Sequence, residues 1–558
     1  MTNRPRRLPR LPRPVLPAAL TVAAALLVFV SLVVPDGLGK LKPGYWIPGA
    51  FLRLPIEAIV GAAVLLVVPA RLRRPAALVI GGGIGLLTLL KVINVGFLLN
   101  LNRRFDPVLD WPLLGDGFNY VEETSGYPLA VLAAVGATLG GLALVVVTAL
   151  AVQRLSGLAA RHRRVATRAV PAVITAWVAL ALVGVTLFPY APMASDSTVV
   201  LAKNTLLRVP RALEEQRAFA AEADNDAFRD LPAERLLRGL AGKDVLVAVV
   251  ESYGRSALDN PKMAATLNPA LEAADARLTA AGFGSRSGFL TSSTYGGGSW
   301  LAHATFQTGL WIPNQGRYRQ AMASRRTTIT KSFQRAGWHT VAVEPGNKHT
   351  WPEADFYGYT EVYDSRNLGY KGPQFGWSSM PDQYTLSFFQ KNVYSQPRRA
   401  PLFAEVTLTS SHTPWAPLPE MVDWDAVGDG SIYGPIAARA VQQDETWQST
   451  GKVRGAYAKS VAYSMDSLTS WAAKYGNDDL VVVIFGDHQA SPRVSGPDAS
   501  HDIPISIIAK DPAVLDRISS WGWTPGMRPD DDAPVTRMDK FRNLFLSAYA
   551  APFASRTH

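Results

Sequence analysis

The most informative part of the sequence is Leu480–His488, LVVVIFGDH. A short apolar run rich in β-branched residues is typical of a strand that is buried on both faces of a sheet. Gly486 lets the chain turn sharply, and two strong metal ligands, Asp487 and His488, follow at once. In open α/β sheets, binding and catalytic residues gather at the carboxyl ends of the strands. The stretch therefore predicts a buried strand that carries two candidate ligands to a site.

A second stretch repeats this arrangement. Val245–Glu251, VLVAVVE, is another apolar run that ends on a carboxylate. Either stretch alone is most simply interpreted as a core strand with an ordinary polar end. Two such strands that bring Glu251, Asp487 and His488 to one edge of a sheet predict a metal site instead.

Length and composition narrow the class of protein. The chain has 558 residues, enough for several domains of ordinary size, and a formal net charge of +11. It contains no cysteine, which excludes disulfides, thiolate metal ligands and a cysteine nucleophile.

The N-terminal part of the chain predicts a transmembrane domain over residues 1–190 with about five spans. A bilayer-spanning helix needs about 20 mostly apolar residues. A signal peptide is the alternative for the first segment, but more apolar segments follow and no small-residue cleavage pattern stands out. The expected spans are Val15–Val34, Leu54–Ala70, Ala76–Leu99, Tyr127–Val152 and Ala169–Phe188.

The distribution of arginines predicts how these spans are oriented. Five arginines stand in the N-terminal arm, three follow the second span and five follow the fourth, all on one side. Positive charge favours the cytoplasmic side, so we expect a multi-pass protein of the cell membrane with a cytoplasmic N-terminus. Everything after Phe188 is then extracytoplasmic. The positive charge is a topology signal, and we expect no nucleic-acid partner.

Lys91 lies within the third predicted span, and Asn94 follows one turn later. An ionisable side chain inside a bilayer is costly and is therefore a candidate for function. It can contact a lipid phosphate, but we expect it to extend to the nearby membrane surface instead.

Beyond the spans, the pattern predicts a helical linker over residues 191–243 and an α/β domain over residues 244–552. Apolar runs alternate there with helical stretches, which is typical of a sheet with helices on both faces. The expected strands are Val245–Val250, Thr340–Val343, Leu402–Leu408, Leu480–Phe485 and Ile503–Ile508. The expected helices are Asn268–Ala281, Thr328–Ala336 and Tyr457–Tyr475.

A glycine-rich turn precedes a candidate nucleophile. In Thr291–Thr308, TSSTYGGGSWLAHATFQT, three glycines stand directly before Ser299 and a helical stretch follows it. Glycines let a substrate approach the backbone, and a helix N-terminus favours anions. Ser299 is thus either a nucleophile for phosphorus that a metal activates, or an ordinary N-cap. Thr294 and Ser292 are rival hydroxyls, disfavoured because they precede the turn, and His303 is expected only to pack.

Two histidines stand at expected strand edges. His412 follows the strand Leu402–Leu408 in TLTSSHTPW, and His501 precedes the last strand in SHDIP. An imidazole at such an edge can contact phosphate oxygens, whereas a histidine in a loop is usually only solvated, and both interpretations stay open. Asp382 and Asp502 stay open as further metal ligands.

Taken in order, the motifs ESYGRS, GGGSW, SSHTPW and GDHQ behind a five-span anchor resemble the lipoteichoic acid synthase and phosphoglycerol transferase branch of the alkaline phosphatase and sulfatase superfamily. Phosphoethanolamine transferases are similar relatives. The resemblance covers the layout of the whole chain, but its specific motifs lie between Val245 and Pro504. It implies an extracytoplasmic catalytic domain of the alkaline phosphatase and sulfatase type. It also implies one divalent metal ion, usually Mn2+ in this branch, with Zn2+ or Mg2+ as alternatives.

Carried over by position, the resemblance assigns metal ligands and a nucleophile. The matching ligands are Glu251, Ser299, Asp487 and His488. Ser299 takes the place of a nucleophilic threonine, which is a departure from the family pattern.

The resemblance also assigns residues that bind substrate. His412 matches a histidine that holds the phosphate, and His501 falls near a phosphate-binding histidine of the phosphoethanolamine transferases. Lys348 and Trp351 lie in GNKHTWPEADFYGY, which resembles the head-group loop. Glu353 stands near the place of an expected arginine, so the donor head group stays open.

The implied function is the transfer of a phosphoglycerol-type or related phospho head group from an anionic membrane lipid to an envelope polysaccharide or lipid. The group passes through a covalent phospho-serine at Ser299. The alternatives are a phosphodiesterase, phosphatase or sulfatase-like hydrolase of the cell envelope, and a non-catalytic membrane scaffold that binds glycan. A sulfatase of the usual type is disfavoured, because Trp-Leu-Ala-His after Ser299 lacks the proline and arginine of C/S-x-P-x-R. The oligomeric state stays open.

Overall fold

The computed structural model describes residues 15–34, 51–111, 113–188, 191–397, 400–496 and 498–551. The chain divides into two compact units, one of Met1–Leu98 with Arg103–Leu213 and one of Leu99–Asn102 with Glu214–His558. The arginines of the N-terminal arm lie outside the described residues, so the structure does not test their part in the predicted orientation.

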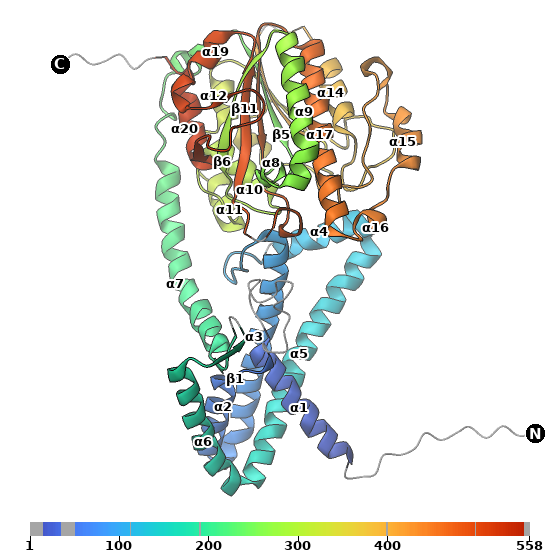
Figure 1. Ribbon diagram of the computed structural model, residues 1–558. Coiled ribbons are helices and arrows are strands. Elements are labelled where there is room, and N and C mark those ends of the chain that lie inside the picture. Colours follow the sequence, from blue (N-terminus) through green and yellow to red (C-terminus); the bar gives the residue numbers. More distant parts are fainter. Residues whose placement is uncertain are drawn as a thin grey trace, which may run out of the picture. The chain divides into compact units, whose positions relative to one another are not determined.

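The N-terminal unit is helical (Figure 1). Among the described residues, three helices are long and apolar enough to cross a membrane: α3 (Ala70–Leu101), α5 (Tyr127–Arg161) and α6 (Arg163–Val183). The other helices are α1 (Val15–Val33), α2 (Ile56–Val67) and α4 (Leu113–Ser125). Each predicted span overlaps one of these helices, but α1 and α2 are shorter than the spans predicted for them. Helix α2 ends at Val67, because Pro69 follows its C-cap residue Val68.

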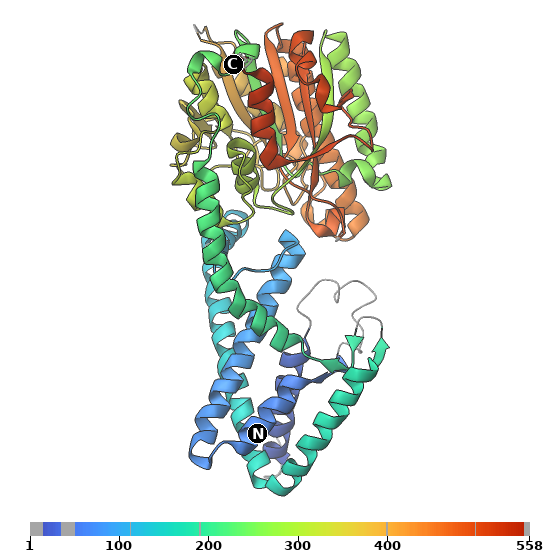
Figure 2. The same ribbon diagram turned by 90° about the vertical axis from the view of Figure 1, so that its left-hand side faces the viewer.

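Short strands and a long helix follow α6. The helix ends at Val183 because Gly184 adopts a left-handed conformation with a φ of 68°, five residues before the predicted end of the span. Figure 2 shows the short strands that come next. They are β2 (Thr186–Phe188), which pairs with β3 (Ala191–Pro192), and β4 (Ala194–Ser195), which pairs with β1 (Leu54–Pro55), the strand that precedes α2. Helix α7 (Ser197–Asp224) occupies much of the predicted linker.

Lys91 is fully buried in α3. Its ammonium donates hydrogen bonds to the carbonyls of Ser31 at 3.1 Å and Leu32 at 2.9 Å, and to the hydroxyl of Thr198 at 2.9 Å. The two carbonyls belong to the last turn of α1, where a helix leaves its carbonyls without intrahelical partners and favours a cation. The prediction that Lys91 extends to the surface is therefore wrong: it caps α1.

The C-terminal unit is built on one mixed sheet, which confirms the predicted α/β domain. Its strands run in the order β12-β6-β11-β10-β5-β9-β7-β8, with β13 beside β6. The strands from β10 to β8 are parallel, whereas β11 is antiparallel to both of its neighbours. Their bounds are β5 (Asp244–Val250), β6 (Gly284–Thr291), β7 (His339–Glu344), β8 (Glu361–Asp364), β9 (Leu402–Leu408), β10 (Leu480–Gly486), β11 (Asp502–Ala509), β12 (Thr524–Pro525) and β13 (Val535–Arg537).

The five predicted strands are all present, but the shorter strands β8, β12 and β13 were missed, and so was the eight-residue strand β6. Its sequence GSRSGFLT is too polar and too rich in glycine to show the apolar pattern of a buried strand. Inside the sheet its polarity is satisfied by partners that the local sequence does not reveal. The hydroxyls of Ser287 and Ser506 in the neighbouring β11, for example, are 2.7 Å apart.

Helices cover both faces of the sheet (Figure 1). Leu246, Ala248 and Val250 of β5 pack toward α9, α14 and α17, whereas the alternate residues Val245 and Val247 pack toward α10, α12 and α20. The helices are α8 (Ser256–Asp259), α9 (Pro261–Ala280), α10 (Ser299–Thr308), α11 (Gln315–Met322), α12 (Ile329–Arg335), α13 (Ala354–Tyr357), α14 (Asp382–Phe389), α15 (Gly434–Arg439), α16 (Gln443–Thr446), α17 (Thr450–Tyr475), α18 (Pro492–Ser495), α19 (Pro512–Asp516) and α20 (Met538–Tyr549).

Two of these helices begin earlier than predicted. The predicted start of α9 was Asn268, but the helix continues before it, and Pro269 lies inside the helix. The helix begins instead at Pro261, where the side chain of Asn260 accepts a hydrogen bond from the backbone of Lys262. Helix α17 likewise begins seven residues before its predicted start, after the capping Ser449.

Candidate active site

The register of two neighbouring parallel strands places the first two candidate ligands side by side. Gly486 in β10 pairs with Val250 in β5, so Asp487 and Glu251 are the next residues of their strands and leave the sheet together. His488 follows. One ligand atom from each of Glu251, Asp487 and His488 lies within 4.8 Å of the others, and all three residues are buried. The structure thus brings together the three residues that the strand patterns predicted at one edge.

Ser299 joins this group from the start of α10. Residues 296–298 are glycines with φ values of 72°, 153° and 83°, a region that L side chains rarely adopt, and they turn the chain into the helix. The hydroxyl of Ser299 donates to Oε2 of Glu251 at 3.0 Å and lies 3.2 Å from Nε2 of His488. The N-cap of α10 is Gly298, so the interpretation of Ser299 as an ordinary N-cap is wrong.

Outer contacts orient the ligand atoms. Nδ1 of His488 lies 2.8 Å from the carbonyl of Gln489, so it carries the ring proton and leaves the Nε2 lone pair to the group. Oδ1 of Asp487 accepts hydrogen bonds from the backbone N–H groups of Ser252 at 2.7 Å and His488 at 2.8 Å. Oδ2 of Asp487 is buried and has no hydrogen-bond partner among the described residues. A buried carboxylate oxygen without a donor is costly, and a metal ligand is one way to satisfy it.

The electrostatics of the group also suit a cation. Burial raises the pKa of Asp487, and the charge of Glu251 raises it further. Burial alone opposes protonation of His488, but the carboxylates of Asp487 and Glu251 outweigh it, so the pKa of His488 is raised. Two carboxylates, one imidazole and one hydroxyl therefore fit a single divalent metal ion.

His412 follows a residue that contacts this group, and its own ring stacks on an aromatic neighbour. The preceding residue, Ser411, donates its hydroxyl proton to the carbonyl of Glu251 at 2.6 Å. The His412 ring stacks on Trp377 with centroids 3.9 Å apart and planes at 25°, and its Nδ1 lies 2.6 Å from the carbonyl of Thr413. No motif in the sequence signalled Trp377.

The other predicted substrate-binding residues lie in three different surroundings. The carbonyl of His501 accepts a hydrogen bond from the backbone of Ser292 at 2.9 Å, and burial lowers the pKa of the His501 ring. Trp351 is half-buried and packs on the rings of Tyr357 and Tyr359, against the core of one sheet face. Lys348 is half-buried in the loop that follows β7. Their contacts with substrate stay predictions.

The rival hydroxyls have other surroundings than Ser299. Ser292 donates to the backbone carbonyl of Asp487 at 2.6 Å, and this bond ties β6 to the end of β10. The hydroxyl of Thr294 is buried and has no hydrogen-bond partner in the described part of the chain. Neither hydroxyl makes a hydrogen bond to a carboxylate or imidazole of the ligand group.

The two further aspartates have partners outside the ligand group. Asp382 accepts hydrogen bonds from the backbone of Ser410 at 2.9 Å and from the hydroxyl of Ser464 at 2.6 Å, and burial raises its pKa to about 6. Asp502 accepts from Thr291 at 2.8 Å and lies 3.7 Å from Arg255. Both residues therefore connect structural elements and lie outside the group of candidate ligands.

A second group of candidate ligands was missed. It consists of His303, Glu344 and Glu405, with one ligand atom of each within 4.8 Å of the others. Burial and the charge of Glu405 raise the pKa of Glu344 to about 8, and burial raises the pKa of Glu405 to about 7. His303 packs on Phe485, as predicted, but it also faces carboxylates. The signal was present: β7 runs into Glu344 as β5 runs into Glu251, and Glu405 interrupts an apolar strand.

Several solved structures resemble this chain at low identity. The lipoteichoic acid synthase LtaP from Listeria monocytogenes is 15% identical, with a TM-score of 0.33 over 48% of this chain and 65% of its own, less than two thirds of its length. The phosphoglycerol transferase GacH from Streptococcus pyogenes, solved with sn-glycerol-1-phosphate, is 14% identical, with a TM-score of 0.36 over 60% and 80%. The C-terminal periplasmic domain of EcEptC from Escherichia coli is 12% identical, with a TM-score of 0.38 over 56% and 83%.

No curated protein matches the chain. The sulfatase family model matches residues 243–507. These residues include β5, β7, β9, β10 and α10, and therefore both groups of candidate ligands. Residues 243–507 thus form a sulfatase-type α/β domain.

Proposed function

We propose that this protein is a metal-dependent transferase that moves a phosphoglycerol-type head group from an anionic membrane lipid to an envelope glycan or lipid. The group passes through a covalent phospho-serine at Ser299. One observation carries the proposal: a hydroxyl at the start of a helix lies within hydrogen-bond distance of both Glu251 and His488. A serine that only capped the helix would have no reason to be bonded there.

The residues that would hold the metal are Glu251, Asp487, His488 and Ser299. A divalent cation in such a site lowers the pKa of a hydroxyl and neutralises charge on phosphate oxygens. Ser299 also lies at the N-terminus of the ten-residue helix α10, whose dipole favours a phosphate at this end. Mn2+ is the ion that the family resemblance favours.

The first half of the reaction transfers the head group to the enzyme. Oγ of Ser299 attacks the lipid phosphorus, a new P–O bond forms, and the bond from phosphorus to the diacylglycerol oxygen breaks. The hydroxyl proton leaves along the hydrogen bond to Oε2 of Glu251. His412 gives a proton to the leaving oxygen.

The second half returns every group to its starting state. An acceptor hydroxyl attacks the phosphorus of phospho-Ser299 and loses its proton to His412. The bond between phosphorus and Oγ breaks, and Ser299 recovers a proton from Glu251. His412, His501, Lys348 and Trp351 are the residues that we expect to contact the phosphate and the head group.

The apolar helices support a lipid substrate. Three helices long and apolar enough to cross a membrane would confine the sulfatase-type domain within reach of lipid head groups. We propose five passes with a cytoplasmic N-terminus, which places this domain outside the cytoplasm, beside the envelope acceptors. Phosphatidylglycerol is the donor that we expect.

The test uses the full chain in detergent with Mn2+ and either phosphatidylglycerol or phosphatidylethanolamine. With phosphatidylglycerol, intact mass spectrometry should show a phosphoglycerol adduct on the protein, and diacylglycerol should be released. Phosphatidylethanolamine should give neither result. An adduct formed only with phosphatidylethanolamine would show that this lipid is the donor, and the covalent mechanism would still hold. Steady release of free glycerol phosphate, with no transfer to added glycolipid, would identify a hydrolase instead. No adduct and no diacylglycerol with either lipid would overturn the proposal.

A further inference from the structure

His303, Glu344 and Glu405 come from three elements and converge next to the first ligand group. His303 lies on α10 one turn after Ser299, Glu344 ends β7, and Glu405 lies within β9, the strand between β5 and β7. Nδ1 of His303 lies 3.9 Å from Oε1 of Glu405. Ligand atoms that each lie about 2.1 Å from one ion are about 3 to 4 Å apart, so this spacing is that of ligands rather than of hydrogen-bonded partners.

Donors outside the group hold both carboxylates in place. Gln307 and the hydroxyl of Tyr359 both donate to Oε2 of Glu405, which leaves Oε1 on the side of His303. The hydroxyl of Thr407 donates to Oε1 of Glu344 at 2.9 Å. Hydrogen bonds of this kind, from a surrounding shell to the ligands, orient carboxylates in metal sites.

The other nitrogen of His303 faces the first group. Its Nε2 is buried without a hydrogen-bond partner among the described residues, and it lies 4.0 Å from Oδ2 of Asp487. The side chain of Asp487 is 0% exposed, and its Oδ2 also has no hydrogen-bond partner among the described residues. A histidine that binds metal through one nitrogen commonly directs its other N–H at a carboxylate, which is the relationship that these two atoms approach.

The two glutamates lack a balancing cation. They are 8% and 2% exposed, and no lysine or arginine of the described residues forms an ion pair with either. Two carboxylates this close in a buried place repel each other, and burial raises the pKa of both. A buried pair of carboxylates is usually neutralised by protons, by a cationic side chain or by a metal ion.

We propose that Nδ1 of His303 and the carboxylates of Glu344 and Glu405 bind a second divalent cation. One nitrogen and two carboxylates suit a transition ion such as Mn2+ or Zn2+ better than Mg2+ or Ca2+, which prefer oxygen ligands alone. Asp487 then lies between the two cations, as a ligand of the first and an acceptor for the Nε2–H of His303. The site does not depend on which lipid serves as the donor.

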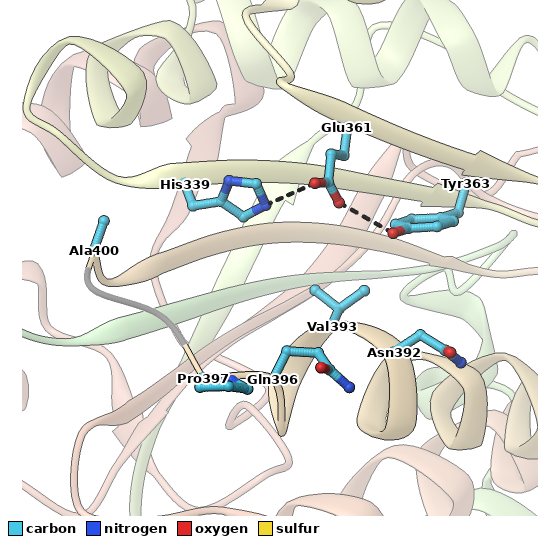
Figure 3. Close-up of a pocket in the computed structure, with 8 residues that line it drawn as sticks. All are labelled: His339, Glu361, Tyr363, Asn392, Val393, Gln396, Pro397 and Ala400. Carbon is cyan, nitrogen blue, oxygen red and sulfur yellow. Dashed lines mark hydrogen bonds and ion pairs between the residues drawn. The ribbon is translucent and has the colours of Figure 1, made fainter.

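The test counts bound ions in the full chain, purified in detergent and loaded with Mn2+ or, in parallel, Zn2+. After desalting, elemental analysis should find two ions per chain in the wild type and one in Glu344→Gln and in Glu405→Gln. The matched control is Glu361→Gln on β8, the strand next to β7. Figure 3 shows Glu361 near His339 and Tyr363, in a pocket of about 420 Å3 at the opposite ends of these strands. This control should keep two ions.

Spectroscopy distinguishes metal binding by these residues from a purely structural role. Two neighbouring Mn2+ ions should give a spin-coupled electron paramagnetic resonance spectrum, and Glu405→Gln should convert it to the signal of an isolated ion. If both glutamine variants fail to fold, His303→Gln provides the test and should also lose one ion. A wild type that binds one ion per chain, or glutamine variants that keep two, would overturn the proposal. Because no lipid is needed, this outcome is independent of the proposed transfer reaction.

Discussion

The hydroxyl of Ser299 donates a hydrogen bond of 3.0 Å to Oε2 of Glu251. Glu251 follows β5 and Ser299 opens α10, 48 residues later in the chain. The glycine turn before α10 is what allows the hydroxyl to reach a carboxylate at the sheet edge. In the proposed reaction, the same contact would orient the serine for attack and provide an exit for its proton.

Ser299→Ala should abolish the covalent adduct and lower turnover on the order of 10^4-fold or more, as other losses of a nucleophile do. Ser299→Thr should keep substantial activity because it retains the hydroxyl oxygen. Intact mass and diacylglycerol release measure both effects. Thr294→Ala is the matched control, since its hydroxyl makes no hydrogen bond in the described structure, and it should retain the adduct. An adduct that peptide mapping places on Thr294 would contradict the assignment.

Glu251→Ala, Asp487→Ala and His488→Ala should each lose the first metal ion and the activity. These side chains lie at the edge of the sheet rather than in its hydrophobic core, so expression and far-UV circular dichroism should stay close to the wild type. Metal content after desalting measures the loss. Full activity in any one of the three variants would remove that residue from the site.

His412→Gln should lower turnover by about 10^2- to 10^4-fold, the usual range for loss of a general acid or base, while metal content stays unchanged. Trp377→Leu removes the ring that stacks on His412. A stacked pair contributes about 0.5–1.5 kcal/mol, so the second loss should be only about 2- to 10-fold. Equal effects of the two substitutions would mean that His412 acts through packing alone.

The metal-free protein should become less stable as the pH rises from about 5 to about 8. The pKa of Glu344 is raised from 4.5 to about 8 and that of Glu405 to about 7, so the folded state holds protons that the unfolded state has already released. This contribution to stability is complete below the unfolded pKa and is lost as the pH passes the folded values. Melting temperatures of the chelator-treated protein measure it. Glu344→Gln should flatten the slope, and a melting temperature that rises over this range in the wild type would contradict the prediction.

A reporter fused after Phe188 should be active only outside the cytoplasm if five spans and the arginine distribution set the topology. An alkaline phosphatase fusion and a cytoplasmic fluorescent fusion at the same residue are the paired measurements. Activity of the cytoplasmic reporter there would place the sulfatase-type domain inside the cell. The proposed lipid and envelope substrates would then be excluded together.

The core strands, and the edge at which the first ligands meet, could be predicted from the sequence. A strand buried on both faces must be apolar along its whole length, so β5 and β10 were visible in the local pattern, as were the acidic residues at their ends. Parallel strands present their carboxyl ends at one edge, which made Glu251 and Asp487 predictable neighbours without knowledge of their register. The same reasoning, applied to β7, would have found Glu344.

The contacts between side chains of different elements could not be predicted, because they depend on the tertiary structure. The polar strand β6 is buried because β11 supplies hydrogen-bond partners such as Ser506, and Lys91 is buried because α1 ends beside it. Ser299 bonds to Glu251 rather than to its own helix because the glycine turn aims it at the sheet edge. His303 and Glu405 come together only through the packing of α10 on β9. A local pattern records whether a residue's own element is buried, whereas the partner of a buried polar group depends on contacts between segments far apart in the chain.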